Sequence, residues 1–147
     1  MNINKLLTPA VMRLIGDQNV PDEKDLGDIL GTTIKAVKGP RRPTDMDNPC
    51  FTAHVSSNPM DPASKVHRGT MIVNFYCDNY DSGNANIELM GTVTDRVITL
   101  FDDEVFSIVG YSNFTLDVQE PLGPLFNPDH SGEHYMSIRL RFVLIKL

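Results

Sequence analysis

The last thirteen residues, Tyr135 to Leu147, place the strongest constraint on the fold. Apolar and other residues alternate there, and the apolar positions of one face are Met136, Ile138, Leu140, Phe142 and Leu144. Alternation with a period of two residues is typical of a strand with one buried face. Beyond Phe142 the opposite face also becomes apolar, with Val143, Ile145 and Leu147. We therefore expect this strand to lie in a sheet and to end covered on both faces, by the sheet or by a neighbouring subunit.

The rest of the chain contains patterns for two helices and four further strands. Helical spacing of apolar residues predicts helices over residues 3–16 and 84–101, the second with Asn84 as its N-cap. Strands are predicted over residues 32–37, 50–55, 69–77 and 106–118, the last with a bulge or bend at Gly110. Residues 121–132 are rich in proline and glycine and predict a loop.

This order of elements predicts an α+β fold: a mainly antiparallel sheet with two helices packed on one face. Two long loops, 38–49 and 56–68, project from the first hairpin region. Loops of this length in a small domain are commonly functional or ordered by a partner. We expect residues 1–147 to form a single domain, because this length can bury one core without disulfides or metals.

Charge and cysteine content exclude several classes of protein. Thirteen Lys and Arg against nineteen Asp and Glu give a net charge of −6, which is unsuited to a general nucleic-acid binder. Cys50 and Cys77 have no CxxC spacing, and we expect both as small core residues in a reduced intracellular compartment. No apolar run is long enough for a signal peptide or a membrane span.

One short motif resembles a catalytic site. Residues His130 to His134 spell HxxEH, the inverted zinc-peptidase pattern, which requires both histidines on one face of a helix. Pro128 precedes the motif, Gly132 interrupts it and a strand follows, so a polar loop is the better interpretation. A small hydrolase that uses the His130/His134 pair, or Cys77 as a nucleophile, is the alternative. We expect no metal and no cofactor.

Basic residues form two clusters outside the last strand. Lys38, Arg41 and Arg42 lie in the first long loop, and Lys65, His67 and Arg68 form a second, weaker cluster just before the third strand. Either cluster is suited to phosphate or to acidic residues of a neighbouring subunit, although exposed charges often have no partner at all.

The order and size of the elements resemble a known family. A helix leads into a hairpin with long loops, then a strand from Val66 to Tyr76, then an amphipathic helix that ends in Arg96 to Phe101, and a final strand with alternating arginines. This arrangement is similar to the tail-terminator proteins of long-tailed bacteriophages, also called tail-completion or tail-to-head joining proteins. Head-closure and adaptor subunits of the phage neck are similar in size and form the nearest alternative.

The resemblance implies a structural virion protein without enzymatic activity. It implies a ring, expected to be a hexamer, that caps the tail tube and joins it to the neck, with DNA passing through the lumen without specific binding. The implied partners are further copies of the chain, the tail tube protein and the neck or head-closure protein, with assembly in the host cytoplasm. A monomeric binding module of a host pathway is a third possibility. The residues expected to contact subunits or partners are Lys38, Arg41, Arg42, Pro59, Asp61, Lys65, Arg68, Arg139 and Arg141.

Overall fold

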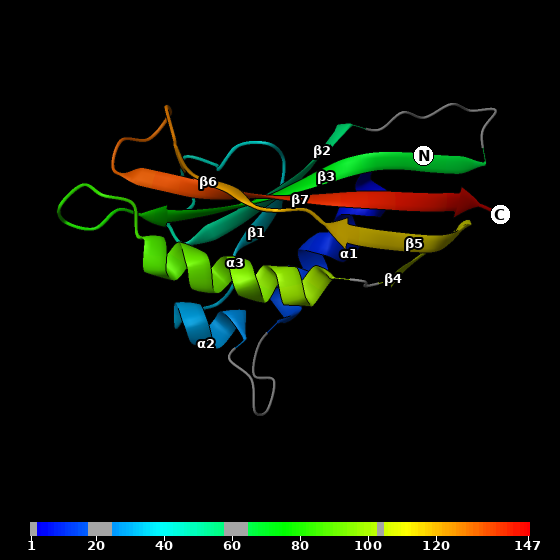
Figure 1. The fold of residues 1–147 in the computed structure, drawn as a ribbon, viewed down its shortest axis with the longest axis horizontal. Coiled ribbons are helices and arrows are strands. Elements are labelled where there is room, and N and C mark those ends of the chain that lie inside the picture. The colour runs from blue at the N-terminus through cyan, green and yellow to red at the C-terminus, as the bar shows by residue number, and fades with distance from the viewer. Residues whose placement is uncertain (1–2, 18–24, 58–64, 103–104) are drawn as a thin grey trace.

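The chain forms one seven-stranded, mainly antiparallel sheet with helices on one of its faces (Figure 1). The computed structural model describes residues 3–17, 25–57, 65–102 and 105–147. Neighbouring strands follow the order β1-β2-β3-β7-β5-β4, and β6 also pairs with β7. Among the strands of the described residues, only the pair formed by β1 (Ala36–Lys38) and β2 (Cys50–Ser57) is parallel. The predicted α+β class is confirmed.

Two long strands, β3 (Val66–Asp78) and β7 (Glu133–Lys146), form the middle of the sheet. They pair without interruption from Val66 opposite Ile145 to Asp78 opposite Glu133. The face predicted to be buried is buried: Ile138, Leu140 and Leu144 have no exposed surface. Beyond them, β5 (Tyr111–Val118) pairs with the second half of β7, and β6 (Leu122–Phe126) pairs with its first half.

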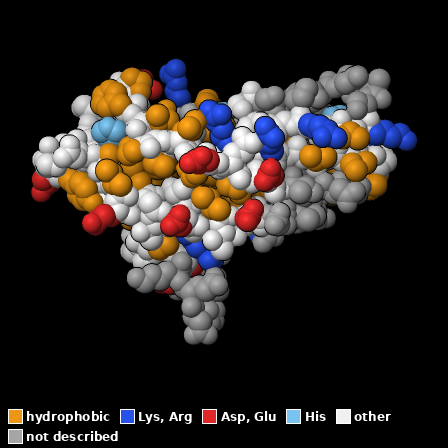
Figure 2. Space-filling view, in the orientation of Figure 1, with side chains coloured by type: hydrophobic (Ala, Val, Ile, Leu, Met, Phe, Trp, Pro, Cys, Tyr) orange, Lys and Arg blue, Asp and Glu red, His pale blue; other side chains and the backbone are white. Residues whose placement is uncertain are grey.

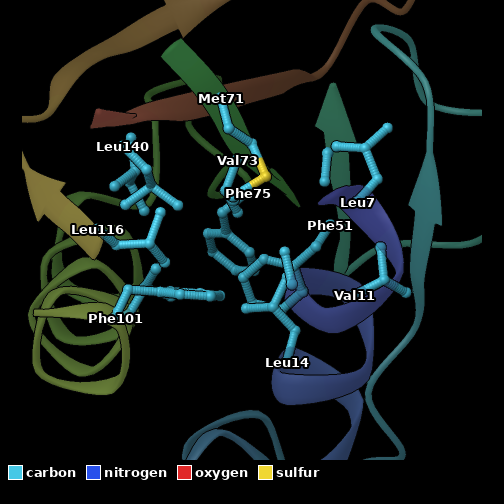
Figure 3. Packing of buried hydrophobic residues seen from close by; sticks show 14 of the residues in the cluster. Leu7, Val11, Leu14, Phe51, Met71, Val73, Phe75, Phe101, Leu116 and Leu140 are labelled. Atoms are coloured by element: carbon cyan, nitrogen blue, oxygen red, sulfur yellow. The ribbon is translucent and has the colours of Figure 1, made fainter. Parts of the chain in front are cut away.

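Two helices cover this buried face, as expected. Leu7, Val11 and Leu14 of α1 (Ile3–Gly16) meet the side chains of the sheet, and Phe101 of α3 (Ile87–Phe101) closes the cluster from the other side (Figure 3). Phe51 of β2 and Phe75 of β3 lie at the centre with their rings 5.0 Å apart. Burial of these large side chains, at about 25 cal/mol per Å² of apolar surface, is the main stabilising term for the fold.

The structure contains a third helix, α2 (Leu26–Leu30), that was not predicted. Asp25 caps its start by accepting a hydrogen bond from the Asp28 amide at 2.8 Å, and Gly31 ends it in the left-handed region at φ 63°. Helix α3 is capped by Asn86 rather than by Asn84, since the Asn86 side chain accepts from the Leu89 amide at 3.2 Å.

Three predicted boundaries in the sheet are corrected. Residues 106–118 form two strands, β4 (Val105–Ile108) and β5, and Gly110 lies at φ 86° in the turn between them instead of forming a bulge. Strand β6 occupies part of the predicted loop 121–132. The predicted loop 56–68 is shorter, because β2 extends to Ser57 and β3 already begins at Val66.

The end of β7 is not covered on both faces within the described part of the chain. Leu147 is 82 % exposed, and Val143 and Ile145 are half-buried. The helices of the described residues cover the opposite face of the sheet. None of the helices in the described ranges is long and apolar enough to cross a membrane.

Candidate functional site

Arg42, expected as a contact for another subunit, is committed to a buried ion pair inside the chain. Its Nε lies 3.1 Å from Oε1 of Glu133 and its Nη2 lies 3.0 Å from Oε2. The two side chains are only 9 % and 3 % exposed. Arg42 also donates to the carbonyl oxygens of Pro43 and Met46. Its charge therefore anchors the first long loop to the start of β7.

The contacts of Glu133 also bear on the HxxEH motif, of which it is the glutamate. Glu133 accepts further hydrogen bonds from the amides of Asn48, at 2.5 Å, and Asn127. His134 is the next strand residue, so it lies on the other face, with its Nδ1 2.6 Å from Oδ1 of Asn79. The strand begins at Glu133, which removes the helical geometry that a shared zinc ion needs. In the described part of the chain, no three His, Cys, Asp or Glu side chains lie close enough to hold a metal ion.

The cysteines are poorly suited to nucleophilic chemistry. Burial raises the pKa of Cys77 to about 12, helped by the charges of Asp78 and Glu133. Burial likewise raises the pKa of Cys50 to about 11. The nucleophile is the thiolate, and these values leave both groups protonated at neutral pH.

The remaining expected residues of the two loops lie in different surroundings. Lys38 joins β1 to α1, because its Nζ donates to Oδ1 of Asn4 at 2.8 Å and to Oγ1 of Thr8 at 2.6 Å. Arg41 is 82 % exposed and its guanidinium lies 4.0 Å from the carboxylate of Asp129. Lys65 is exposed immediately before β3. Pro59 and Asp61 lie outside the described residues.

Three expected residues do come together on the open face of the sheet. Arg139 lies opposite Ile72, Arg141 lies opposite Thr70, and Arg68 lies opposite Val143. The three side chains are exposed on the face opposite the helices, and we call them the arginine row (Arg68, Arg139 and Arg141). Arg68 and Arg141 border a shallow depression over β3 and β7. Among the described residues, none of the three guanidinium groups has a hydrogen bond or an ion pair.

A second charged surface, which the sequence analysis did not single out, runs along the outside of α3. Glu88, Asp95 and Asp102 are exposed and recur every seven residues, and we call them the acidic stripe. Seven residues are close to two helical turns, so Glu88 and Asp95 lie on one side of the helix, and Asp102 is the residue that caps its C-terminal end. Figure 2 shows acidic side chains along α3 and, above them, basic side chains over the strands. The seven-residue spacing was visible in the sequence and is the signal that could have identified this surface.

An apolar group lies at the end of the sheet beyond the arginine row. Val66, Val109 and Leu147 are 38 %, 86 % and 82 % exposed. They lie near one another because the amide of Leu147 donates to the Gly110 carbonyl at 3.0 Å and Val66 pairs with Ile145. Exposed apolar residues grouped at a sheet end mark a candidate contact surface.

Comparison with known proteins identifies the fold without a matching sequence. No family model matches the chain, and no curated protein matches its sequence. A solved chain described as "Virion of native gene transfer agent (GTA) particle" is similar in structure, with a TM-score of 0.60. The superposition covers 93 % of this chain and 96 % of that chain at 10 % identity. The two chains therefore share a fold over nearly their whole lengths.

Proposed function

We propose that this protein is a structural subunit of a virion and has no enzymatic activity. The observation that carries the proposal is the fold shared, over 93 % of this chain, with a chain of a gene transfer agent virion. The burial of both thiols and the occupation of Glu133 by Arg42 support it, because they disfavour the two hydrolytic alternatives.

Within the virion, we propose the role of a tail terminator: a ring, expected to be a hexamer, that caps the tail tube and joins it to the neck. The order of elements resembles that family, and the surfaces of the chain suit a ring. The arginine row and the acidic stripe lie on different surfaces of the molecule, one on the open sheet face and the other on the outside of α3. Two different patches of this kind favour head-to-tail association, which closes into a ring when the rotation is right.

The proposed partners are further copies of the chain, the tail tube protein and the neck protein, with DNA passing through the lumen. Lys38, Arg41, Lys65 and the segment with Pro59 and Asp61 remain proposed contacts with the tube or the neck. A head-closure or adaptor subunit is the second candidate, since such a protein would also form a ring at the same junction.

Two measurements test the proposal. Mass photometry of the purified protein, alone and with isolated tail tubes, is expected to show a species of 6 × 16.4 kDa, or about 98 kDa, at least when tubes are present. Gold-labelled antibody is expected to mark one end of purified tails and the neck of whole particles in electron micrographs.

The location of the label separates the candidates. Label on heads that lack tails, and none on tails that lack heads, would favour the head-closure role. A chain that stays monomeric with tubes and is missing from particles would contradict both roles.

A further inference from the structure

We propose that, in the ring of the proposed function, the arginine row of one copy binds the acidic stripe on α3 of the next copy. This inference rests on that function, and it assigns the contact that joins one subunit to another. The occupant of the open sheet face is therefore the outer surface of a helix from an identical chain.

The first observation is the uneven distribution of charge. The chain carries a net charge of −6, yet Arg68, Arg139 and Arg141 lie together on the open face of β3 and β7. Asp117 lies opposite Arg141 in the register with β5 but forms no ion pair with it. The arginine row is still a net positive surface, because among its described partners in the strand register only one residue, Asp117, carries a negative charge.

The acidic stripe is a negative surface. The cation within α3, Arg96, already forms a bidentate pair with Asp17, at 2.8 and 2.7 Å, and so leaves the stripe negative. Between the carboxylates lie small side chains: Gly91 and Thr92 after Glu88, and Thr99 after Asp95. The hydroxyls of Thr92 and Thr99 donate to the helix carbonyls of Glu88 and Asp95 at 3.0 and 3.1 Å, so burying them leaves no unsatisfied donor.

The spacings of the two surfaces match. Glu88 and Asp95 lie about 10 Å apart along the helix, at ~1.5 Å per residue. Arg68 pairs with Val143, which is four residues from Arg139 along β7. The two arginines are therefore about 13 Å apart along the strand direction, at ~3.3 Å per residue. Flexible arginine side chains span this difference easily. Docking of α3 along β3 and β7 would therefore pair two carboxylates with the arginine row.

Apolar residues favour a protein over a nucleic acid as the occupant. Ile72 and Val143 are half-buried between the arginines on the same face, and Ile87, beside Glu88, is 65 % exposed. A subunit interface buries such residues, whereas binding to duplex DNA depends mainly on contacts with phosphates. Matching charges also set the register and suppress wrong pairings.

Complementary charge reversals test the contact. Variant S carries Arg139→Glu and Arg141→Glu, and variant H carries Glu88→Lys and Asp95→Lys. Each alone places like charges across the contact, and we expect the midpoint concentration for ring assembly to rise by a factor on the order of ten or more. In a 1:1 mixture every contact between S and H is matched again, so rings of alternating copies should form. A chain with all four changes should also assemble.

Two charge changes away from the proposed contact serve as controls. Lys5→Glu and Asp81→Lys change exposed charges elsewhere and should leave assembly unchanged. Circular dichroism melts check that S and H remain folded.

Two results would overturn this inference and leave the proposed function standing. In one, the wild-type chain, S and H all form rings equally well. In the other, S and H each fail to form rings and their 1:1 mixture fails as well. Loss of binding to a 30-base-pair duplex in S, with ring assembly intact, would overturn it in favour of a DNA surface. A wild-type chain that never forms a ring, even with tail tubes, would overturn the proposed function as well.

Discussion

Replacing Arg42 with Met is expected to lower the free energy of unfolding by about 3–5 kcal/mol. That is the usual cost of removing one partner from a buried ion pair, because the remaining charge stays desolvated and unpaired. Glu133 is 3 % exposed and would keep only the amide groups of Asn48 and Asn127. For a domain of this size the loss corresponds to a decrease in Tm of about 10–15 °C.

The neighbouring residue supplies a matched control. Arg41 is 82 % exposed and 4.0 Å from Asp129, so Arg41→Met is expected to cost less than about 0.5 kcal/mol. Urea unfolding followed by circular dichroism, at a concentration where the chain is monomeric, compares the two variants. Equal midpoints would mean that the Arg42–Glu133 pair contributes nothing. Loss of ring assembly in Arg42→Met without loss of monomer stability would instead place Arg42 at the subunit contact that the sequence suggested.

Three further predictions concern backbone, thiols and pH. Gly91→Ala should stabilise the monomer by about 0.5–1 kcal/mol in thermal unfolding, because Gly91 lies in α3 with no atom within 4 Å of an added Cβ. Gly123→Ala should destabilise it, since Gly123 has φ +140° and an added Cβ would lie 2.7 Å from Sδ of Met136. Cys50 and Cys77 should react with Ellman's reagent at pH 8 far more slowly in the folded protein than in urea, and rapid labelling of either in the folded state would contradict their burial. Stability should fall as the pH rises above about 9, because the unfolded thiols lose their protons there while the folded ones keep theirs up to about 11 and 12; a flat profile between pH 8 and 10.5 would refute this.

The elements with long and regular hydrophobic patterns were predictable. Strands β3 and β7 and helices α1 and α3 each repeat their period several times, so that one misplaced residue does not obscure the pattern. The boundary between β4 and β5 was not predictable in this way. Their connection, Val109 and Gly110, puts Ile108 opposite Tyr111 and so changes the parity of the face, but a register shift then puts Phe106 opposite Phe114 and restores it. The sequence alternation therefore continues as if there were one strand.

Short elements stabilised by the rest of the fold were also missed. Helix α2 has five residues and depends on the Asp25 cap, the burial of Leu26 and a hydrogen bond from the Leu26 amide to Asp17. Strand β6 contains Gly123 and Pro124, which disfavour a strand in isolation, and it exists because β7 offers an edge to pair with.

The candidate site was predictable only in part. The two-residue period placed Arg139 and Arg141 on one face, but Arg68 joins them through the pairing of β3 with β7, across more than seventy residues of sequence. Nothing local distinguishes Arg41 from Arg42, although one is exposed and the other buried. That difference depends on where Glu133 lies, which only the folded structure determines.

At 10 % identity, the likeness to a virion chain concerns the fold and does not transfer the surface chemistry of that chain to this one. The fold determines how the outer surfaces are oriented. A sheet with helices on one face presents an open sheet surface on one side and a helical surface on the other. Such a scaffold associates head to tail once the two surfaces attract each other, whatever residues supply the attraction. In the contact proposed above, those residues are arginines on the strands and carboxylates on α3. If charge supplies the attraction, assembly must weaken as ionic strength rises from 50 to 500 mM, because salt screens exposed charges over about 4 to 14 Å. Assembly that is unchanged across this range would shift the attraction to the apolar group of Val66, Val109 and Leu147.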